Sequence, residues 1–199
     1  MVVVEAEHYT SQALTKIRKW YTIDANSQQP HGNTTGSHFR SASAAAYLEI
    51  LPDTRTNHDE KLIHGENFSN EPGKLGVLHY YVIIDNPGKY FVWVRAYSTG
   101  TEDNGLHVGI DDQWVESGQR MQWCENKNQW TWASKQRTEQ EHCGVERLIY
   151  LQIEKPGLHK ISFSMREDGF EFDKWILSKD YQAPENVGPQ ESPTKIVSL

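Results

Sequence analysis

The 199-residue chain has no long apolar run, only two cysteines and no run of Lys or Arg. A membrane-spanning helix needs roughly 20 consecutive apolar residues, so we expect no membrane as a partner. The 20 basic residues are outnumbered by 27 acidic ones, which gives a formal net charge of −7. Nonspecific binding of nucleic acid requires many cations that displace condensed counterions, so nucleic acid is excluded as well. The expected ligand is therefore uncharged, or carries a charge that nearby groups of the protein compensate.

Signatures of common catalytic sites are also missing. The chain has no GxSxG, P-loop, GxGxxG or HExxH motif, and its nine histidines lack zinc-ligand spacing. A glycosidase needs two carboxyl groups about 5–10 Å apart, and the adjacent acids at 102–103 and 167–168 are the available candidates. Adjacent acids in turns are normally solvated, so we expect no enzyme. A divergent hydrolase or lyase domain is the less favoured alternative, because sites assembled from distant residues leave no motif.

Short segments of alternating polar and apolar residues, separated by Gly, Pro, Asn and Asp, fill most of the chain. No helical period extends over a window of about 11 residues. The pattern predicts an all-β protein, a two-sheet antiparallel β-sandwich. The expected strands lie at residues 2–7, 46–51, 78–84, 89–97, 106–110, 130–136, 148–154, 159–165 and 170–177.

Two turns contain a Pro-Gly pair, at residues 85–88 and 155–157. Proline presets φ and glycine supplies a positive φ, so each turn predicts a hairpin between the strands on either side of it. The strand at 89–97 carries bulky residues on both faces. It is therefore expected in the middle of a sheet.

One domain is expected, over residues 1–179. Residues 52–74 indicate a long insertion, and long ordered loops are often functional. Residues 180–199 contain three prolines and little apolar area, which predicts a linker or C-terminal tail. Met1 leads directly into an expected strand, without the charged region or cleavage site of a signal peptide. We therefore expect a piece of a larger secreted protein.

The two cysteines, Cys124 and Cys143, flank a Trp-rich segment and form neither a CxxC zinc pair nor a redox motif. A local disulfide is the favoured interpretation, closing a loop of about 20 residues. Two buried free thiols in a cytosolic domain are the alternative. Seven Trp and nine Tyr are many for this length, so some rings are expected at the surface.

Glu5 and Glu7 stand two residues apart on an expected strand, so both side chains should point to one side of the sheet. Two carboxylates this close favour a cation. Ca²⁺ takes six to eight oxygen ligands, and Asp173 near the last strand offers a third carboxylate. Equally, alternating charge is typical of any half-exposed edge strand.

Four segments occur in an order that resembles carbohydrate-binding modules of families 6 and 35. They are VEAEHY at 4–9, LHYYV and PGKYFVWVRA within 78–96, KPGLHKI at 155–161 and FEFDKWI at 170–176. The resemblance spans residues 2–178, and all four segments together are far more specific than any one. It implies a galactose-binding-like jelly roll, non-catalytic and attached to secreted polysaccharide-degrading enzymes.

In those families the E-A-E segment and the Asp near the last strand hold a structural Ca²⁺. The resemblance therefore assigns Glu5, Glu7 and Asp173 as metal ligands. This chain is longer than a typical member, and the excess lies near 52–74 and 117–146. Both insertions could reshape or cover the usual binding clefts.

Sugar recognition combines an aromatic face with planar polar groups. The resemblance indicates Trp130 as the stacking platform and Trp132 as a more buried partner, with Trp123 in the same Trp-rich segment. Tyr47 is the nearest match to the opposite aromatic wall. All of these rings could instead belong to the core.

Candidate hydroxyl partners come from two loops. They are Glu102 and Asn104 in the first loop, and Arg166 and Asp168 before the last strand. The Asn that family 6 often places before this strand is missing, which leaves the ligand open. A neutral galactan such as agarose is compatible with the net negative charge of the chain. A sulfated or uronic-acid polymer is the alternative ligand, and Arg166, Arg120 or Arg137 would bind its anionic groups.

The sequence thus predicts a secreted, monomeric, non-catalytic module with one Ca²⁺ and one disulfide. Its partners would be a polysaccharide and a catalytic domain of the same parent chain, which it would hold near the substrate. The alternative is a structural or adhesion β-sandwich that contacts other protein domains through the Trp-rich loop.

Overall fold

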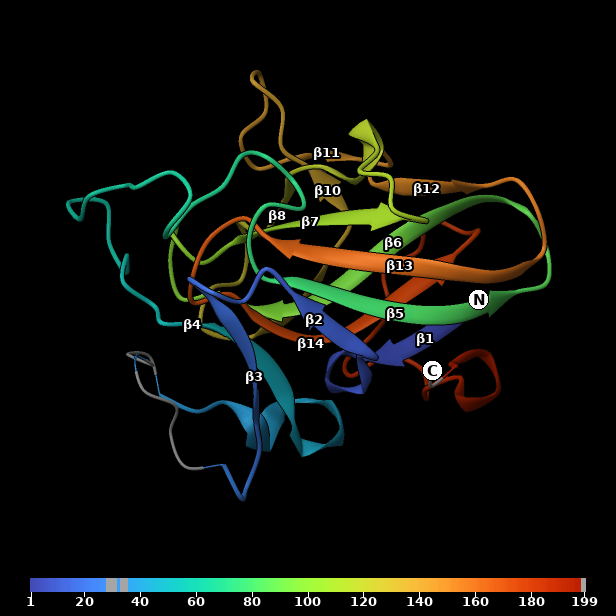
Figure 1. Cartoon of the computed structure of the whole chain (residues 1–199), viewed down its shortest axis with the longest axis horizontal. Coiled ribbons are helices and arrows are strands. Elements are labelled where there is room, and N and C mark those ends of the chain that lie inside the picture. Colours follow the sequence, from blue (N-terminus) through green and yellow to red (C-terminus); the bar gives the residue numbers. More distant parts are fainter. Residues whose placement is uncertain (28–31, 33–35, 198–199) are drawn as a thin grey trace.

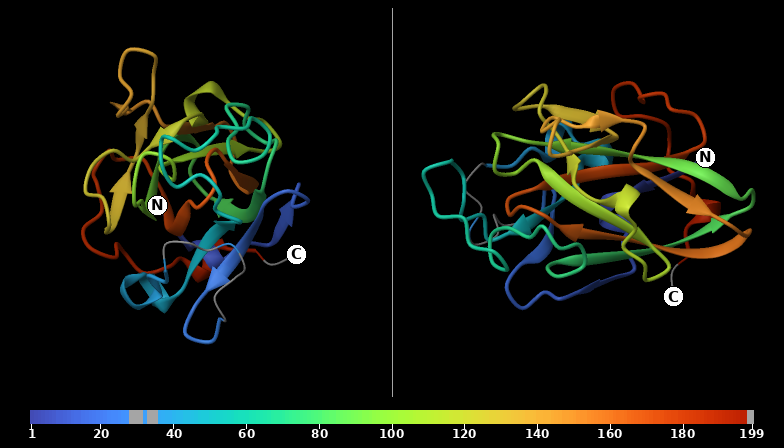
Figure 2. Two further views of the ribbon diagram at one scale, coloured as in Figure 1. Left: turned by 90° about the vertical axis from the view of Figure 1, so that its left-hand side faces the viewer. Right: turned by 90° about the horizontal axis from the view of Figure 1, so that it is seen from above.

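The computed structural model describes residues 1–27, 32 and 36–197, which form two antiparallel sheets packed face to face (Figures 1 and 2). In this described part the regular elements other than strands are short 3-10 turns, and no helix is long and apolar enough to cross a bilayer. The all-β, two-sheet antiparallel sandwich predicted from the sequence is confirmed. The 3-10 turns are η1 (Ala6–His8), η2 (Phe39–Ser41), η3 (Ser43–Ala45), η4 (Glu116–Gly118) and η5 (Pro193–Lys195).

Each sheet has seven strands in the described residues, and many of the paired strands are far apart in sequence. Sheet A has the order β12-β6-β14-β4-β3, with β1 paired to β14 and β9 paired to β6. Its strands are β1 (Val2–Glu5), β3 (Lys19–Ile23), β4 (Tyr47–Leu51), β6 (Gly88–Tyr97), β9 (Trp130–Ala133), β12 (Tyr150–Ile153) and β14 (Glu171–Ser178). As expected, β6 lies inside the sheet.

Sheet B has the order β11-β10-β8-β7-β13-β5-β2. Its centre is formed by long pairings of β13 with β5 and with β7. Its strands are β2 (Ser11–Ala13), β5 (Val77–Ile84), β7 (Gly105–Ile110), β8 (Met121–Gln122), β10 (Lys135–Gln136), β11 (Val145–Glu146) and β13 (Gly157–Met165).

The two Pro-Gly turns are present, but the hairpins predicted from them are wrong. β5 belongs to sheet B and β6 to sheet A, and the same holds for β13 and β12. Each turn carries the chain from one sheet to the other, so its two strands face each other across the core instead of sharing hydrogen bonds. The Pro-Gly pair predicts only that the chain reverses its direction. The two strands then lie in different sheets, because this arrangement buries the inner faces of both sheets against each other.

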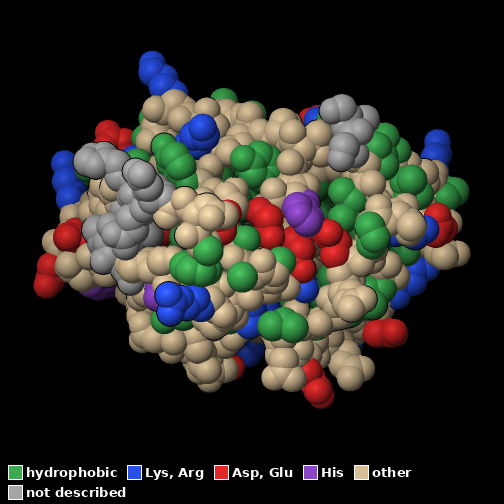
Figure 3. Space-filling view, turned by 90° about the horizontal axis from the view of Figure 1, so that it is seen from below, with side chains coloured by type: hydrophobic (Ala, Val, Ile, Leu, Met, Phe, Trp, Pro, Cys, Tyr) green, Lys and Arg blue, Asp and Glu red, His purple; other side chains and the backbone are tan. Residues whose placement is uncertain are grey.

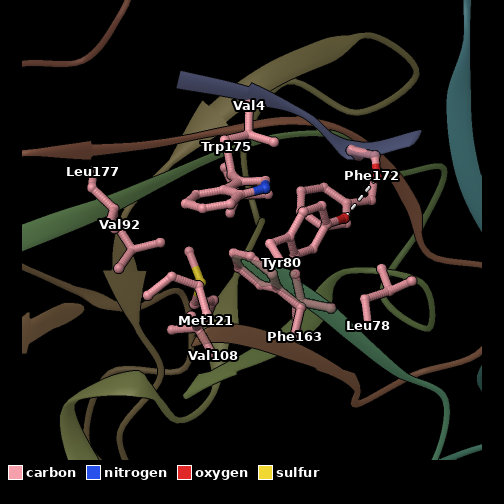
Figure 4. Close-up of a cluster of buried hydrophobic side chains, with 14 of the residues drawn as sticks. Val4, Leu78, Tyr80, Val92, Val108, Met121, Phe163, Phe172, Trp175 and Leu177 are labelled. Carbon is pink, nitrogen blue, oxygen red and sulfur yellow. Dashed lines mark hydrogen bonds between the residues drawn. The ribbon is translucent and has the colours of Figure 1, made fainter. Parts of the chain in front are cut away.

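The core lies between the sheets and is rich in aromatic rings (Figure 4). Tyr80, Phe163 and Trp175 meet edge to face or tilted, with ring centroids 5.2 to 5.8 Å apart. The Tyr80 hydroxyl donates a hydrogen bond to the Ala6 carbonyl at 2.7 Å, so its one polar atom is satisfied. Contacts of this geometry add to the free energy gained by burying the rings.

A β-bulge in β14 places charged residues outside this core. The register against β6 shifts between Phe172 and Lys174. Phe172 and Trp175 therefore both reach the core although they are three residues apart, and Asp173 and Lys174 both take partners on the outer face. A bulge commonly re-aims side chains in this way.

Residues 180–197, expected as a linker or tail, lie along the sandwich. Tyr181 packs on Phe91 and Trp93, with ring centroids 5.0 and 4.9 Å away. Further along, the Ser192 amide donates to the Val3 carbonyl at 2.9 Å and the Val197 amide to the Tyr81 carbonyl at 2.8 Å. The segment therefore covers part of the outer face of sheet A and then reaches an edge of sheet B.

Candidate functional site

The residues predicted to bind sugar fall into separate groups. Trp130 and Tyr47 lie on the outer face of sheet A, in β9 and β4. Glu102, Asn104, Arg166 and Asp168 lie in loops at the end of the sandwich where the 52–74 insertion projects (Figure 1, teal to cyan). Trp123 lies in the core next to this second group.

Trp130 and Tyr47, expected as opposite aromatic walls of a sugar site, lie in direct contact. Their ring centroids are 5.3 Å apart, and Tyr97, the cross-strand partner of Trp130, is 5.5 Å from the indole. Trp130 is half-buried, whereas Tyr47 is fully buried, and burial raises its pKa well above the usual range. Tyr47 therefore supports Trp130 from below and has no surface of its own for a ligand.

Glu102 and Asp168 are held by residues of the insertion. Glu102 forms an ion pair with Arg55, and its Oε1 lies 2.5 Å from His58 Nδ1. Asp168 accepts hydrogen bonds from the Thr54 amide at 2.9 Å and the Thr54 hydroxyl at 2.8 Å. Both carboxylates are at most 5% exposed. The insertion thus covers this loop cluster, as its length suggested it could.

Asn104 and Arg166 are likewise satisfied inside the protein. Arg166 pairs with Glu167, and Glu167 Oε2 accepts from the Asn104 amide at 2.9 Å. Gln122 donates to the side-chain carbonyl of Asn104. Burial raises the pKa of Glu167, an effect that Arg166 opposes. These groups form a buried charged network, which leaves neither Asn104 nor Arg166 facing the solvent.

Trp123 is only 2% exposed and packs on Phe170, with ring centroids 5.0 Å apart. Its ring therefore offers no free face to a sugar. The disulfide predicted between Cys124 and Cys143 is confirmed, with Cα atoms 5.3 Å apart. The disulfide joins the beginning of the Trp-rich segment, at Cys124, to Cys143 just before β11, and so holds the Trp-rich loop in place.

A small pocket lies beside this disulfide, and we call it the Trp132 pocket. Trp132, expected as the more buried partner of Trp130, is half-buried, and so is Trp130. One part of its ring lies close to Gly188, where a Cβ would come within 2.6 Å, and another part lines the pocket. The other lining residues include Gln122, Trp123, Glu125, Asn126 and Lys135.

The buried Nε1 of Trp123 and Oε1 of Gln122 have no hydrogen-bond partner among the residues described. Both residues line the Trp132 pocket. Sequence reasoning missed Gln122 and Lys135, because β8 and β10 are two-residue strands without a visible pattern.

The three predicted cation ligands lie near one another on the outer face of sheet A. β1 ends at Glu5, and Glu7 lies in the turn η1, so the expected extended pair is replaced by a strand end and a 3-10 turn. Glu5 Oε1 is 2.8 Å from Lys174 Nζ, and Asp173 Oδ2 is 2.6 Å from Arg95. Two cations of the chain therefore already compensate part of the negative charge.

Two observations still fit a cation at this cluster. Glu5 Oε2 and Glu7 Oε2 are buried and have no hydrogen-bond partner in the part of the chain that the structure describes. Burial and the charge of Glu5 raise the pKa of Glu7 to about 7. Burial also raises the pKa of Asp173 to about 6, against the opposing effect of Arg95. Against this, no group of three or more His, Cys, Asp or Glu in the described residues is arranged as a metal site.

His8 adds a titratable group beside these carboxylates. Its Nδ1 lies 2.8 Å from Glu191 Oε1, and although burial lowers its pKa, Glu191 and the charges of Glu7 and Glu5 raise it overall. The face seen from below shows acidic side chains gathered around a histidine (Figure 3).

Comparison with known proteins shows the family to which the chain belongs. Residues 34–191 match the family model described as "Glycosyl hydrolase family 115 C-terminal domain". A relative from Formosa agariphila, "Uncharacterized protein P23", is 51% identical over 191 residues. The match covers 95% of this chain and 46% of the relative, so the chain spans less than half of that protein.

Solved structures with a similar arrangement include a Paenibacillus xanthan lyase, with a TM-score of 0.49 and 13% identity over 89% of this chain and 13% of that one. A CBM35 from Paenibacillus barcinonensis has a TM-score of 0.43 and 10% identity over 90% of this chain and all of that one. The family match covers most of the chain and is not to carbohydrate-binding families 6 or 35. The chain belongs to the glycosyl hydrolase family 115 C-terminal domains and is a carbohydrate-associated β-sandwich.

Proposed function

We propose that this chain is a non-catalytic domain that binds a polysaccharide and holds a larger carbohydrate-active protein close to it. The observation that carries the proposal is the match of residues 34–191 to a domain found at the C-terminus of glycosyl hydrolases. An accessory domain of this kind raises the effective concentration of substrate at a linked catalytic domain. The disulfide is compatible with a secreted parent, because such bonds persist in oxidising compartments.

The ligand surface proposed for this function is the Trp132 pocket together with the neighbouring ring of Trp130. Most other predicted contact residues are buried, which leaves these two half-buried indoles as the aromatic groups of the Trp-rich segment that a sugar can reach. Asn126 and Lys135 supply polar groups at the same place. A neutral galactan such as agarose is the proposed ligand. The Arg137 amide donates a hydrogen bond to the Arg120 carbonyl at 2.8 Å, so these two basic residues lie next to each other. Because of their charges, an anionic polymer is the second candidate ligand.

Affinity electrophoresis in gels containing agarose, porphyran, carrageenan, alginate, xylan, β-glucan or mannan should show retardation by one polymer. Trp132→Ala should weaken that retardation severalfold, since one aromatic contact contributes about 0.5–1.5 kcal/mol. Its melting temperature should stay within a few degrees of the parent, because the half-buried ring packs at the margin of the outer-face cluster around Trp93 and Ile176 and not in the core between the sheets.

Trp132→Phe serves as the matched control and should retain most binding. Uniform migration in every gel, together with dimers in gel filtration, would instead support the role of a protein-contacting domain. Release of new sugar ends from the retarding polymer would contradict the non-catalytic assignment.

We also propose that Glu5, Glu7 and Asp173 hold a structural Ca²⁺, supported by the two unpartnered carboxylate oxygens. The pKa of Glu7 is raised from 4.5 to about 7, so between these values the folded protein binds more protons than the unfolded chain. Stability without calcium should therefore fall as pH rises through this window, because the stabilising proton is lost. Calcium binds the ionised form, so it should raise the melting temperature more at pH 8 than at pH 5.

The measurement is a pair of melting curves at each pH, with calcium and with a chelator. Asp173→Asn removes one charged ligand and keeps the shape, so it should abolish the difference between the two curves. Equal melting temperatures with and without calcium at pH 8 would contradict the calcium site and leave Lys174 and Arg95 as the cations that compensate this cluster among the described residues.

A further inference from the structure

A second pocket lies on the outer face of sheet B, on the other layer of the sandwich from Trp130. It has a volume of about 140 Å³ and is lined by Trp114, His79, Gln113, Leu14 and Ser162, with Gly73 and Gly109 among the remaining residues. We call it the Trp114 pocket. None of the sequence motifs pointed to it, because its residues come from β2, β5, β7, β13, the segments that follow β2 and β7, and the end of the insertion.

The floor of the pocket is low because small residues stand in register across the sheet. Ser11, His79, Ser162 and Gly109 follow one another on four neighbouring strands, and the last three of them line the pocket. Three of the four have side chains of one heavy atom beyond Cβ or none. The row therefore leaves a depression that larger side chains would fill.

Trp114 forms one wall of the pocket because two glycines let the indole approach the backbone. A Cβ at Gly73 would lie 2.2 Å from the indole Nε1, and a Cβ at Gly109 would lie 2.9 Å from its Cε3. The chain reverses just before this residue, where Asp111 and Asp112 both have positive φ, at 48° and 64°. Successive positive φ values are typical of a tight type I′ reversal, which folds Trp114 back over β7.

Leu14 at the rim is held in an unfavourable conformation. Its φ is 53°, a region that side-chain-bearing residues rarely adopt, and its side chain is 53% exposed. Strain of this kind clusters at ligand sites. Leu14 thus places an apolar group in solvent beside the pocket.

The polar groups of the pocket carry no net charge. His79 Nδ1 lies 2.8 Å from the Ser162 hydroxyl, and burial together with the charge of Lys160 lowers its pKa, so the ring is neutral at pH 7. Asp112 is paired with Lys160, and Gln113 is uncharged with an exposed side chain. No Lys or Arg is among the described residues that line the pocket, so its lining does not favour an anionic ligand.

An indole face, an apolar rim and neutral hydrogen-bonding groups together match the chemistry of a pyranose, whose C–H face stacks on an aromatic ring while its hydroxyls need donors and acceptors. We propose that the Trp114 pocket binds one neutral pyranose unit of a polysaccharide chain, at a site separate from the Trp132 pocket. The choice of a polysaccharide as the ligand class rests on the proposed function, whereas the location of the site rests on the geometry of the pocket alone. Two separate sites would let one domain contact two chains or two parts of one chain.

The test follows the seven tryptophan indole N–H signals of the ¹⁵N-labelled full chain in NMR spectra during titration with neutral tetrasaccharides of agarose, xylan and cellulose. Trp114→Phe assigns the Trp114 signal by its disappearance. At least one of these sugars should shift that signal in the parent protein. Gln113→Ala should weaken the same titration severalfold at an unchanged melting temperature, whereas Gln140→Ala, also at an exposed glutamine, should have no effect.

The possible failures are distinct. Shifts confined to the Trp130 and Trp132 signals would overturn the Trp114 pocket and leave the proposed function standing. Retardation in the polymer gels without a Trp114 shift for any tetrasaccharide would also overturn it. Absence of both retardation and shifts would overturn the proposed function together with this inference.

Discussion

Replacing Asp168 with alanine should lower the free energy of unfolding by about 3–5 kcal/mol, the usual cost of removing one partner of a buried ion pair. Asp168 is fully buried and accepts a hydrogen bond from Arg18 at 3.0 Å, in addition to those from Thr54. Arg18 is itself 7% exposed, so its charge would be left in the protein without that compensation. Denaturant unfolding monitored by tryptophan fluorescence measures the loss.

The matched control is Asp85→Ala, which breaks the exposed ion pair with Lys195. Exposed pairs contribute about 0–1 kcal/mol, so this variant should unfold nearly like the parent. A small loss for Asp168→Ala combined with loss of polymer binding would return Asp168 to the role of a ligand contact. A large loss with binding intact at low temperature supports the structural role.

Removing the disulfide should also have a large effect. The double variant Cys124→Ser, Cys143→Ser opens a cross-link between residues 19 apart in sequence, and the chain-entropy estimate for such a loop is about 3 kcal/mol. The same loss is expected for the parent protein under reducing conditions. Melting curves with and without reductant measure it, and the double variant should be insensitive to reductant.

The local contacts of the loop will remain in this variant. Lys127 Nζ donates to the Trp123 carbonyl and to the Ser98 hydroxyl, each at 2.7 Å. The variant should therefore fold, but ordering the loop on binding would cost more, so polymer affinity should fall as well. Unchanged affinity would show that the ligand does not depend on the Trp-rich loop, and would direct attention to the Trp114 pocket.

The positions of turns and the central strand β6 were readable from residue order, because Pro-Gly pairs and alternating side chains act over a few residues. The strand partners were not. β5 and β6 share a tight turn yet belong to different sheets. Pairing depends on which inner faces can be buried together, and this requires the whole set of strands.

The candidate site shows the same division. Aromatic residues in the segment 123–132 predicted a cluster of rings, and the structure places two of them at the surface and Trp123 in the core. Nothing in the spacing of Glu102 and Asp168 indicated that residues 54–58 would neutralise them. These two carboxylates are buried because the loop at 54–58 covers them, and this loop is distant from both of them in sequence.

Composition and local pattern were enough to specify an all-β chain, its turns and a disulfide between its only two cysteines, because each depends on residue type and short separations. The pairing across the sandwich, the burial of Tyr47, Arg166 and Asp168, and the glycine-lined seat of Trp114 arose only from the packing of distant segments. These depend on which surfaces exclude water together, and hydrophobic burial is non-directional. The folded arrangement therefore decides which aromatic and polar groups remain free to bind a ligand.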